Sequence, residues 1–114
     1  MSATPPTLDE TFRALADPTR RAVVQALGRG PASVSELARP FEMALPSFLQ
    51  HLKVLEESGL VSTTKTGRVR TCSLRSEPLA AAETWLEAQR SLWMHRLDRL
   101  DALVLQLKND EERP

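Results

Sequence analysis

The segment from Glu77 to Lys108 constrains the fold of this chain more than any other. It contains no glycine, its one proline is its second residue, and a leucine or tryptophan recurs every seven residues. This spacing predicts a helix of about 30 residues, roughly 45 Å long, which exceeds what a domain of this size can cover. We therefore expect its apolar stripe, which Leu97 and Val104 widen, to pack against a second chain. The alternative is a helix folded back on its own core.

The first 59 residues are divided by local signals into four short helical segments. Asp17 and Pro18 start the second segment, because aspartate caps a helix and proline is tolerated at the first helical position. Ser33 and Glu36 have the spacing of a capping box at the start of the third. Gly59 can adopt the left-handed conformation that ends a helix, and so closes the fourth. The predicted helices span residues 8–16, 18–27, 33–41 and 46–58.

The third and fourth segments are separated by a brief turn, which is the helix-turn-helix arrangement. The following residues, 60–66 and 69–74, are rich in β-branched side chains, and Gly67 with Arg68 forms a turn between them. This pattern predicts a β-hairpin directly after the helix-turn-helix. The fold class is therefore mainly α with a small β-hairpin wing.

Charge is distributed unevenly along a chain whose formal net charge is zero. Residues 1–76 carry a net charge of +3 and residues 77–114 a net charge of −3, and residues 60–76 hold four cations and no acid. A basic hairpin beside a helix-turn-helix favours contact with DNA. The alternative is an ordinary solvated hairpin.

Several classes of protein are disfavoured by the composition. The chain has no apolar run of about 18 residues, which argues against a membrane span. Residues 1–7 carry no cation and no apolar stretch, so we interpret them as a flexible arm rather than a signal peptide. A single cysteine, Cys72, excludes an intrachain disulfide and fits a reducing cytoplasm. No catalytic triad, phosphate-binding loop or cluster of acids indicates an enzyme.

Several motifs, in order and at consistent spacing, resemble the ArsR-type (arsenic-repressor-like) family of winged helix-turn-helix repressors. They are FRALADPTRR at 12–21, SELA at 35–38, LKVLEESGLV at 52–61 and TGR at 66–68. The similarity covers about residues 11–99. The C-terminal part, with Trp85, Trp93 and Leu97, is similar to a subgroup without the usual metal ligands.

The resemblance implies a homodimeric repressor with five helices and a β-hairpin between the fourth and the fifth. In this interpretation residues 1–7 are the arm, 8–76 the DNA-binding domain, 77–108 the dimerisation helix and 109–114 a charged tail. The terminal helices form the dimer interface. Its candidate residues are Leu8, Phe12, Leu86, Trp93, Leu97, Leu100 and Val104.

The predicted partner is double-stranded DNA carrying a pseudo-palindromic operator. Ser47 and Gln50, on the polar side of the fourth helix, are the best candidates for contacts with base edges, since glutamine can pair with adenine. Leu45 and Leu49 are weaker candidates, an apolar side chain at Leu49 being able to touch a thymine methyl group. The candidates for phosphate or minor-groove contact are Lys53 in the helix and Lys65, Arg68 and Arg70 in the wing.

The sequence also departs from the family pattern. Metal-sensing members often have Cys-x-Cys in the third helix, where this chain has none. Other members have paired carboxylate and histidine ligands on the last helix, where this chain has one histidine, His95, with Asp98 three residues on. We therefore predict no metal site and no cofactor. The family often has serine at the positions of Ala44 and Leu49; Ala44 cannot cap the fourth helix, and this places the operator sequence in question.

For several other residues, the sequence leaves two interpretations open. Arg20 and Arg21 contact phosphate or are structural, and His51 is structural or faces phosphate rather than binding a metal. Cys72 is a small buried residue or a redox switch. Trp85 and Trp93 pack in the core or dimer, or line a pocket for an inducer whose identity the sequence does not indicate. As a whole, the chain is a DNA-binding repressor or, alternatively, a winged-helix module that binds protein.

Overall fold

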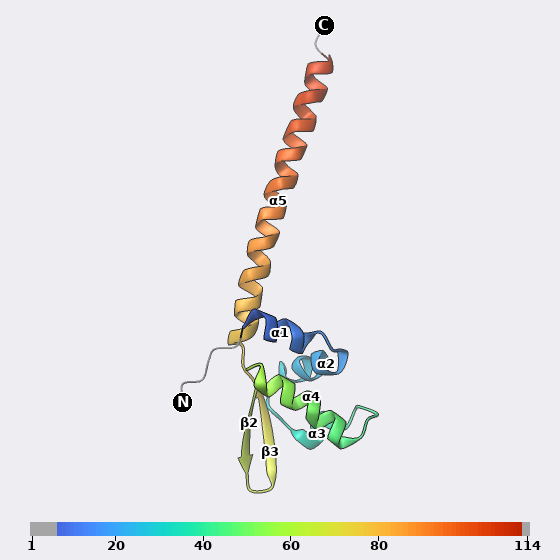
Figure 1. Ribbon diagram of the computed structural model, residues 1–114, viewed down its shortest axis with the longest axis vertical. Helices are drawn as coiled ribbons and strands as arrows, with labels where there is room; N and C mark the ends of the chain where they lie inside the picture. The colour runs from blue at the N-terminus through green and yellow to red at the C-terminus, as the bar shows by residue number, and fades with distance from the viewer. Residues whose placement is uncertain (1–6, 113–114) are drawn as a thin grey trace. The chain divides into compact units, whose positions relative to one another are not determined.

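The computed structural model describes residues 7–112. Their elements follow one another along the chain as α1 Leu8–Leu15, α2 Pro18–Leu27, β1 Ala32–Ser33, α3 Val34–Ala38, α4 Leu45–Glu57, β2 Val61–Thr66, β3 Val69–Leu74 and α5 Glu77–Glu112 (Figure 1). The chain divides between Ala82 and Glu83 into two units, which we describe separately. The first holds α1–α4 and a small three-stranded sheet, which is the predicted winged helix-turn-helix class.

Local capping fixes the starts of α1 and α2. The carboxylate of Asp17 accepts a hydrogen bond from the Arg20 N–H at 3.0 Å, and Pro18 is the first residue of α2, as predicted. Thr7, which we expected in the flexible arm, instead caps α1: its hydroxyl accepts from the Glu10 N–H, and the Glu10 carboxylate accepts from the Thr7 N–H. The remainder of the predicted arm lies outside the described residues.

The start of α3 differs from the predicted capping box. Ser33 Oγ accepts from the Glu36 N–H at 3.1 Å, but the Glu36 carboxylate accepts from the Ser33 hydroxyl rather than from its backbone. Ser33 belongs to β1, which pairs antiparallel with β3. The helix also ends at Ala38, earlier than the predicted Phe41. Pro40 explains the early end, because it has no N–H to extend the helical hydrogen bonds.

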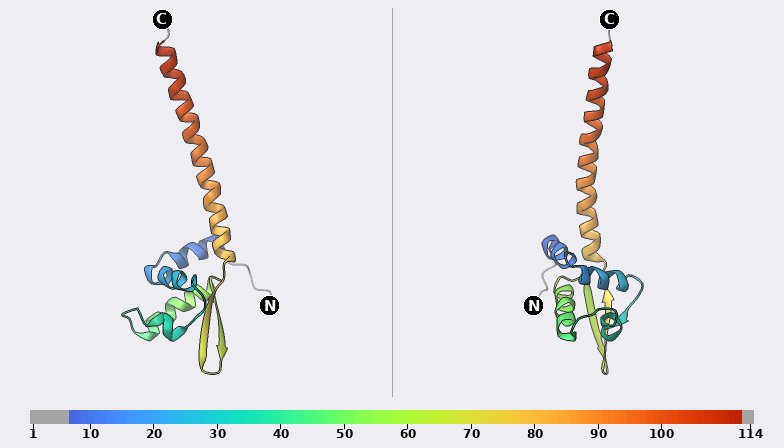
Figure 2. Two further views of the ribbon diagram at one scale, coloured as in Figure 1. Left: turned by 180° about the vertical axis from the view of Figure 1, so that it is seen from behind. Right: turned by 90° about the vertical axis from the view of Figure 1, so that its right-hand side faces the viewer.

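The sheet has the order β1-β3-β2, and all its strands pair antiparallel. The predicted hairpin is β2 with β3, joined at Gly67, whose φ of 64° is the left-handed conformation that such a turn requires. Strand β1 was not predicted from the sequence, and it adds two residues beside Thr71 and Cys72. The views in Figures 1 and 2 agree that the hairpin turn extends past α3 and α4 at one end of this unit.

The core of the first unit is formed by apolar side chains from helices α1 to α4 and from the sheet. Phe48, Leu52 and Leu55 give α4 its buried face, and Cys72 of strand β3 is fully buried. Gly59, with φ of 79°, ends α4 in the conformation predicted for it. The buried apolar cluster comprises Ala14, Val23, Leu27, Leu37, Phe48, Leu52, Leu55, Leu60, Val61 and Cys72.

Helix α5 has 36 residues and continues four residues beyond the predicted end at Lys108. Residues 109–112, which we assigned to a charged tail, are therefore helical, while 113–114 lie outside the described residues. Every described residue from Glu83 onward is exposed. The second unit consequently has no core of its own.

Candidate nucleic-acid interface

The outward face of α4 carries residues that we predicted from the sequence to contact DNA. Because Phe48, Leu52 and Leu55 point into the core, the opposite side of the helix faces solvent. Gln50 and Lys53 lie on that opposite side, and both are exposed. Ser47 is exposed on the flank of the same face. Three polar side chains are therefore available to a groove that accepts α4.

The two leucines at the start of α4 differ in accessibility. Leu45 is 54% exposed, whereas Leu49 is only partly exposed and packs against the core. Ala44, at the cap position, makes no side-chain hydrogen bond to the helix, as predicted from its methyl group. Of the two leucines, Leu45 is thus the one able to offer its full side chain to a thymine methyl group.

An acid that the sequence analysis overlooked lies on the outward face of α4. Glu57 Oε1 is 3.9 Å from Lys53 Nζ, an exposed pair four residues apart along the helix. The i,i+4 spacing was the signal available in the sequence. Both side chains are largely exposed, so the pair is weak in water, and a phosphate approaching Lys53 would find the Glu57 carboxylate nearby.

The three wing cations occupy different environments. Lys65 and Arg68 are exposed and form no salt bridge with any residue between Thr7 and Glu112. Arg70 instead donates to Glu56 Oε1 at 2.9 Å and to Thr63 Oγ1 at 3.5 Å. Since Glu56 belongs to α4, this ion pair connects the wing to the helix. Arg68, at the hairpin turn, and Lys65 are the cations that stay available to phosphate.

Arg20 and Arg21 both donate hydrogen bonds to the end of α1. Arg20 donates through Nε to the Ala14 carbonyl oxygen at 2.8 Å and through Nη2 to the Arg13 carbonyl oxygen at 3.1 Å, and Arg21 Nη1 donates to the Leu15 carbonyl oxygen at 2.9 Å. These carbonyls belong to the last turn of α1, where the Arg13 carbonyl oxygen also accepts from the Ala16 N–H at 3.2 Å. The two guanidinium groups therefore cap the end of α1.

His51 joins α4 to the start of α2. Its Nδ1 accepts a hydrogen bond from Arg20 Nη1 at 3.1 Å and lies 3.6 Å from Asp17 Oδ2. The pKa of Asp17 is lowered, first by the hydrogen bond from the Arg20 N–H and also by the positive charge of the Arg20 guanidinium. The structural interpretation of His51 is the one that these contacts favour.

The described residues offer few groups that could sense a metal ion or an oxidant. Within residues 7–112, no three histidine, cysteine or acidic side chains are grouped to hold a metal ion. Burial raises the pKa of the Cys72 thiol, so this side chain lacks the exposed, easily formed thiolate of a redox switch. No helix in the described part of the chain is both long and apolar enough to cross a membrane.

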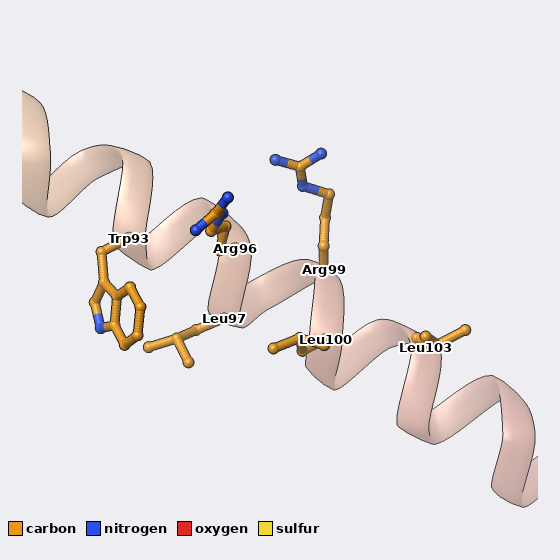
Figure 3. A pocket seen from close by; sticks show the side chains of 6 residues that line it. All are labelled: Trp93, Arg96, Leu97, Arg99, Leu100 and Leu103. Carbon is orange, nitrogen blue, oxygen red and sulfur yellow. The ribbon is translucent and has the colours of Figure 1, made fainter.

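The predicted dimer residues of α5 are exposed and apolar. Trp93 is 59% exposed, Leu97 36% and Val104 60%, and Leu86 and Leu100 are exposed as well. Figure 3 shows Trp93, Leu97 and Leu100 along one side of the helix, with Arg96 and Arg99 pointing to the other. The shallow depression between these side chains has walls from α5 alone and does not include Trp85. It is a helix surface rather than an enclosed ligand site.

In the first unit, Phe12 is exposed on α1, whereas Leu8 is only partly exposed. These two complete the set of side chains that the sequence assigned to a dimer interface.

Comparison with known proteins places this architecture in a family. Residues 15–64 match the model of a helix-turn-helix domain. The chain is 44% identical over 79 residues to the HTH-type transcriptional regulator Rv2034 of Mycobacterium tuberculosis, covering 69% of this chain and 74% of that protein. It is 28% identical over 79 residues to the transcriptional repressor SdpR of Bacillus subtilis, covering 69% and 88%.

Solved structures of similar proteins point to the same family. The crystal structure of an ArsR family transcriptional regulator is 60% identical, with a TM-score of 0.73 over 76% of this chain and 96% of that one. An ArsR-like transcriptional regulator from Rhodococcus sp. RHA1 is 30% identical, with a TM-score of 0.71 over 84% and 91%. These proteins are regulators rather than enzymes. With its exposed α4 face and basic wing, the chain belongs to the ArsR family of helix-turn-helix, DNA-binding transcriptional regulators.

Proposed function

We propose that this regulator is a homodimeric repressor that binds a pseudo-palindromic operator. Helix α4 lies in the major groove, and the β2–β3 wing contacts the flanking backbone or minor groove. The dimer forms through the terminal helices, α5 being the dimerisation helix. A regulator of this kind acts where the DNA is, so we expect the chain in the cytoplasm.

The observation that carries this proposal is the combination of the α4 face and the wing in one compact unit. Gln50 and Lys53 are exposed on α4, while Arg68 and Lys65 are exposed on the wing. The Arg70–Glu56 ion pair links the two elements that bear them. Base-edge contacts from a helix and phosphate contacts from a basic hairpin are the two components of specific DNA binding.

Repression is supported by the relative named a transcriptional repressor, and dimerisation by the exposed stripe of α5. A stripe of large apolar side chains that stays exposed among the described residues is typical of a protein interface. Two copies of α4 related by a two-fold axis suit two half-sites of one operator.

The test is selection of bound duplexes from a random DNA pool with the purified chain, together with its mass in solution. We expect a dimer that enriches a pseudo-palindromic motif. Enrichment of a non-repeated motif by a monomer would contradict the symmetric complex. If a folded chain enriches no motif at low salt, sequence-specific repression is wrong.

A winged-helix module that binds protein is the second candidate. It is favoured by Glu57, which places a carboxylate on the outward face of α4, and by the exposed apolar side chain of Leu45. The same DNA selection distinguishes the two, since this candidate predicts no enrichment.

A further inference from the structure

The outer part of the wing is exposed to solvent. Residues 64–70, which include the hairpin turn, are all exposed, whereas Val61 and Cys72 toward the base of the hairpin are buried. Both Lys65 and Arg68 lie in this outer part. A two-stranded hairpin without other support is only marginally stable in water. The position of these two cations relative to α4 therefore depends on the contacts that hold the outer wing to the helix.

The side chain of Arg70 makes such a contact. Its Nη2 donates to Glu56 Oε1 of α4 at 2.9 Å and to Thr63 Oγ1 of β2 at 3.5 Å. Arg70 and Cys72 are two residues apart on β3, so their side chains point to the same face of the sheet. Cys72 belongs to the buried cluster that contains the inner face of α4, which explains why Arg70 points toward that helix. In the described part of the chain, no other side chain of residues 64–70 forms a hydrogen bond or salt bridge with α4.

The Arg70–Glu56 pair differs from the exposed pair within α4. Its nitrogen and oxygen atoms are 2.9 Å apart, and the side chains of Arg70 and Glu56 are 42% and 30% exposed. The corresponding atoms of Lys53 and Glu57 are 3.9 Å apart, and both side chains are 67% exposed. A closer and less exposed pair is screened less by water and salt. It also joins two elements, whereas the Lys53–Glu57 pair joins two turns of one helix.

The strand register gives Glu56 a second effect on the wing. Arg70 lies directly opposite Lys65 in the pairing of β2 with β3. Opposite residues of an antiparallel pair point to the same face, where two like charges repel. Glu56 neutralises one of these two cations, Arg70, and so reduces the repulsion between the strands. Lys65 remains available to phosphate.

We propose that the Arg70–Glu56 pair orients the wing for DNA and that Arg70 itself contacts no phosphate. The role of the pair rests on the proposed operator binding, which it deepens by assigning Arg70 and Glu56 as positioning residues. In the free chain, the pair holds Lys65 and Arg68 in the orientation that reaches the flanking DNA. Without it the wing samples several orientations, and the apparent affinity falls by the fraction of chains that are in the binding orientation.

The substitution Glu56→Gln separates a positioning role from a phosphate contact by the sign of its effect. If Arg70 contacted phosphate, removal of the acid would free the cation, and DNA binding would tighten. If the pair orients the wing, binding weakens although the chain has become less negative. We expect the dissociation constant for the duplex enriched from a random pool to rise roughly threefold. Tighter binding by Glu56→Gln would overturn the proposal.

Glu57→Gln is the matched control on the same helix. It also removes one acid, but the partner of Glu57 is Lys53, so no contact with the wing is lost. We expect this variant to bind the same duplex as tightly as the unmodified chain or more tightly. If Glu57→Gln weakens binding as much as Glu56→Gln does, the effect does not come from the wing, and the positioning role is wrong.

The salt dependence of binding distinguishes Arg70 from Arg68. Each phosphate contact adds about 0.9 to the slope of the logarithm of affinity against the logarithm of salt concentration. Arg68→Gln should therefore reduce the slope by about one unit. Arg70→Gln should raise the dissociation constant roughly threefold and leave the slope unchanged, because the bound wing still makes the same phosphate contacts. A slope that falls by about one unit for Arg70→Gln would show that Arg70 contacts phosphate.

The double variant Glu56→Gln with Arg70→Gln tests whether the two residues act as one unit. We expect it to bind roughly threefold more weakly than the unmodified chain, as each single variant does, whereas independent roles predict a loss of about ninefold. Urea denaturation checks that every variant is folded. An additive loss would refute the pair as the positioning device. An unmodified chain that binds no duplex would instead refute operator binding itself, which separates the two failures.

Discussion

The two units of this chain differ in whether their apolar residues are buried. In the first, Phe48 is 1% exposed and its neighbours on α4 and the sheet form one buried cluster. In the second, Leu97, Leu100 and Val104 are exposed although their spacing is equally regular. A regular apolar stripe thus indicates that the helix face is buried, but it does not identify the surface that covers it. The first stripe is covered within the chain, and we propose that the second is covered by another copy.

The largest effect should follow from placing charges on the second stripe. Leu97→Asp with Leu100→Asp would bury four carboxylates in the dimer, and we expect the dissociation constant to rise by more than about 100-fold. The mass in solution should become that of a monomer. Fluorescence of Trp93 should shift to that of a solvated indole, and hydrogen exchange should accelerate in α5.

The same variant also tests whether the first unit folds without dimerisation, because that unit has its own core. Amide exchange around Phe48 and Leu52 should stay slow in the monomer. A matched control is Asp98→Leu, which alters the same helix away from the stripe and should leave the dimer intact. If the α4 amides lose protection together with α5, the first unit is not independent of dimerisation.

Next in size are the wing cations. Replacing Lys65 and Arg68 by alanine should weaken binding across DNA sequences and reduce the salt slope by about one to two units.

Gln50→Ala should instead cost about 1–3 kcal/mol at one base position and alter which base is preferred. Titrations at several salt concentrations with matched and mismatched duplexes measure both. Equal loss on every duplex for Gln50→Ala would remove it from the base contacts.

A smaller effect concerns the start of α4. Ala44→Ser supplies the missing cap and should raise the free energy of unfolding by about 1 kcal/mol, since serine can accept a hydrogen bond from a free backbone N–H. Urea denaturation measures this gain. Ser47→Ala, on the exposed flank of the same helix, controls for a general change of polarity. No gain from Ala44→Ser would mean that water already satisfies those N–H groups.

The smallest effect is the pH dependence contributed by Asp17. Its pKa is lowered in the folded chain, so its charge stabilises the fold above the unfolded pKa of about 4, and this stability is lost as the pH falls through the folded pKa. Asp17→Asn retains a cap but not the charge. It should cost about 0.3–1 kcal/mol at pH 7 and almost nothing near pH 2. A cost that is equal at both values would contradict a role for the charge.

Local signals explain how much of the first unit could be predicted. Asp17, Gly59 and Gly67 act on their own neighbours, so the helix starts, the end of α4 and the hairpin turn followed from the sequence. Contacts between distant residues did not. The pairing of β1 with Cys72, the hydrogen bond between Arg20 and His51, and the ion pair between Glu56 and Arg70 join residues that only the fold brings together.

The candidate site shows the same division. The sequence predicted that Gln50 and Lys53 share the polar side of α4, because helical periodicity fixes which residues share a face. It could not distinguish Leu45 from Leu49, whose difference depends on how far the core extends beneath the first turn of α4. Nor could it separate Arg70 from Arg68, since only the fold supplies Glu56 as a partner.

The mass of the chain bound to a single selected duplex shows whether two copies bind one operator together. Light scattering of the purified complex, at saturating protein, gives the number of chains on each operator. We predict two chains on one pseudo-palindromic duplex and, for Leu97→Asp with Leu100→Asp, strongly weakened binding to it. One chain per duplex, or unchanged binding by the monomeric variant, would contradict a repressor that reads its operator as a dimer.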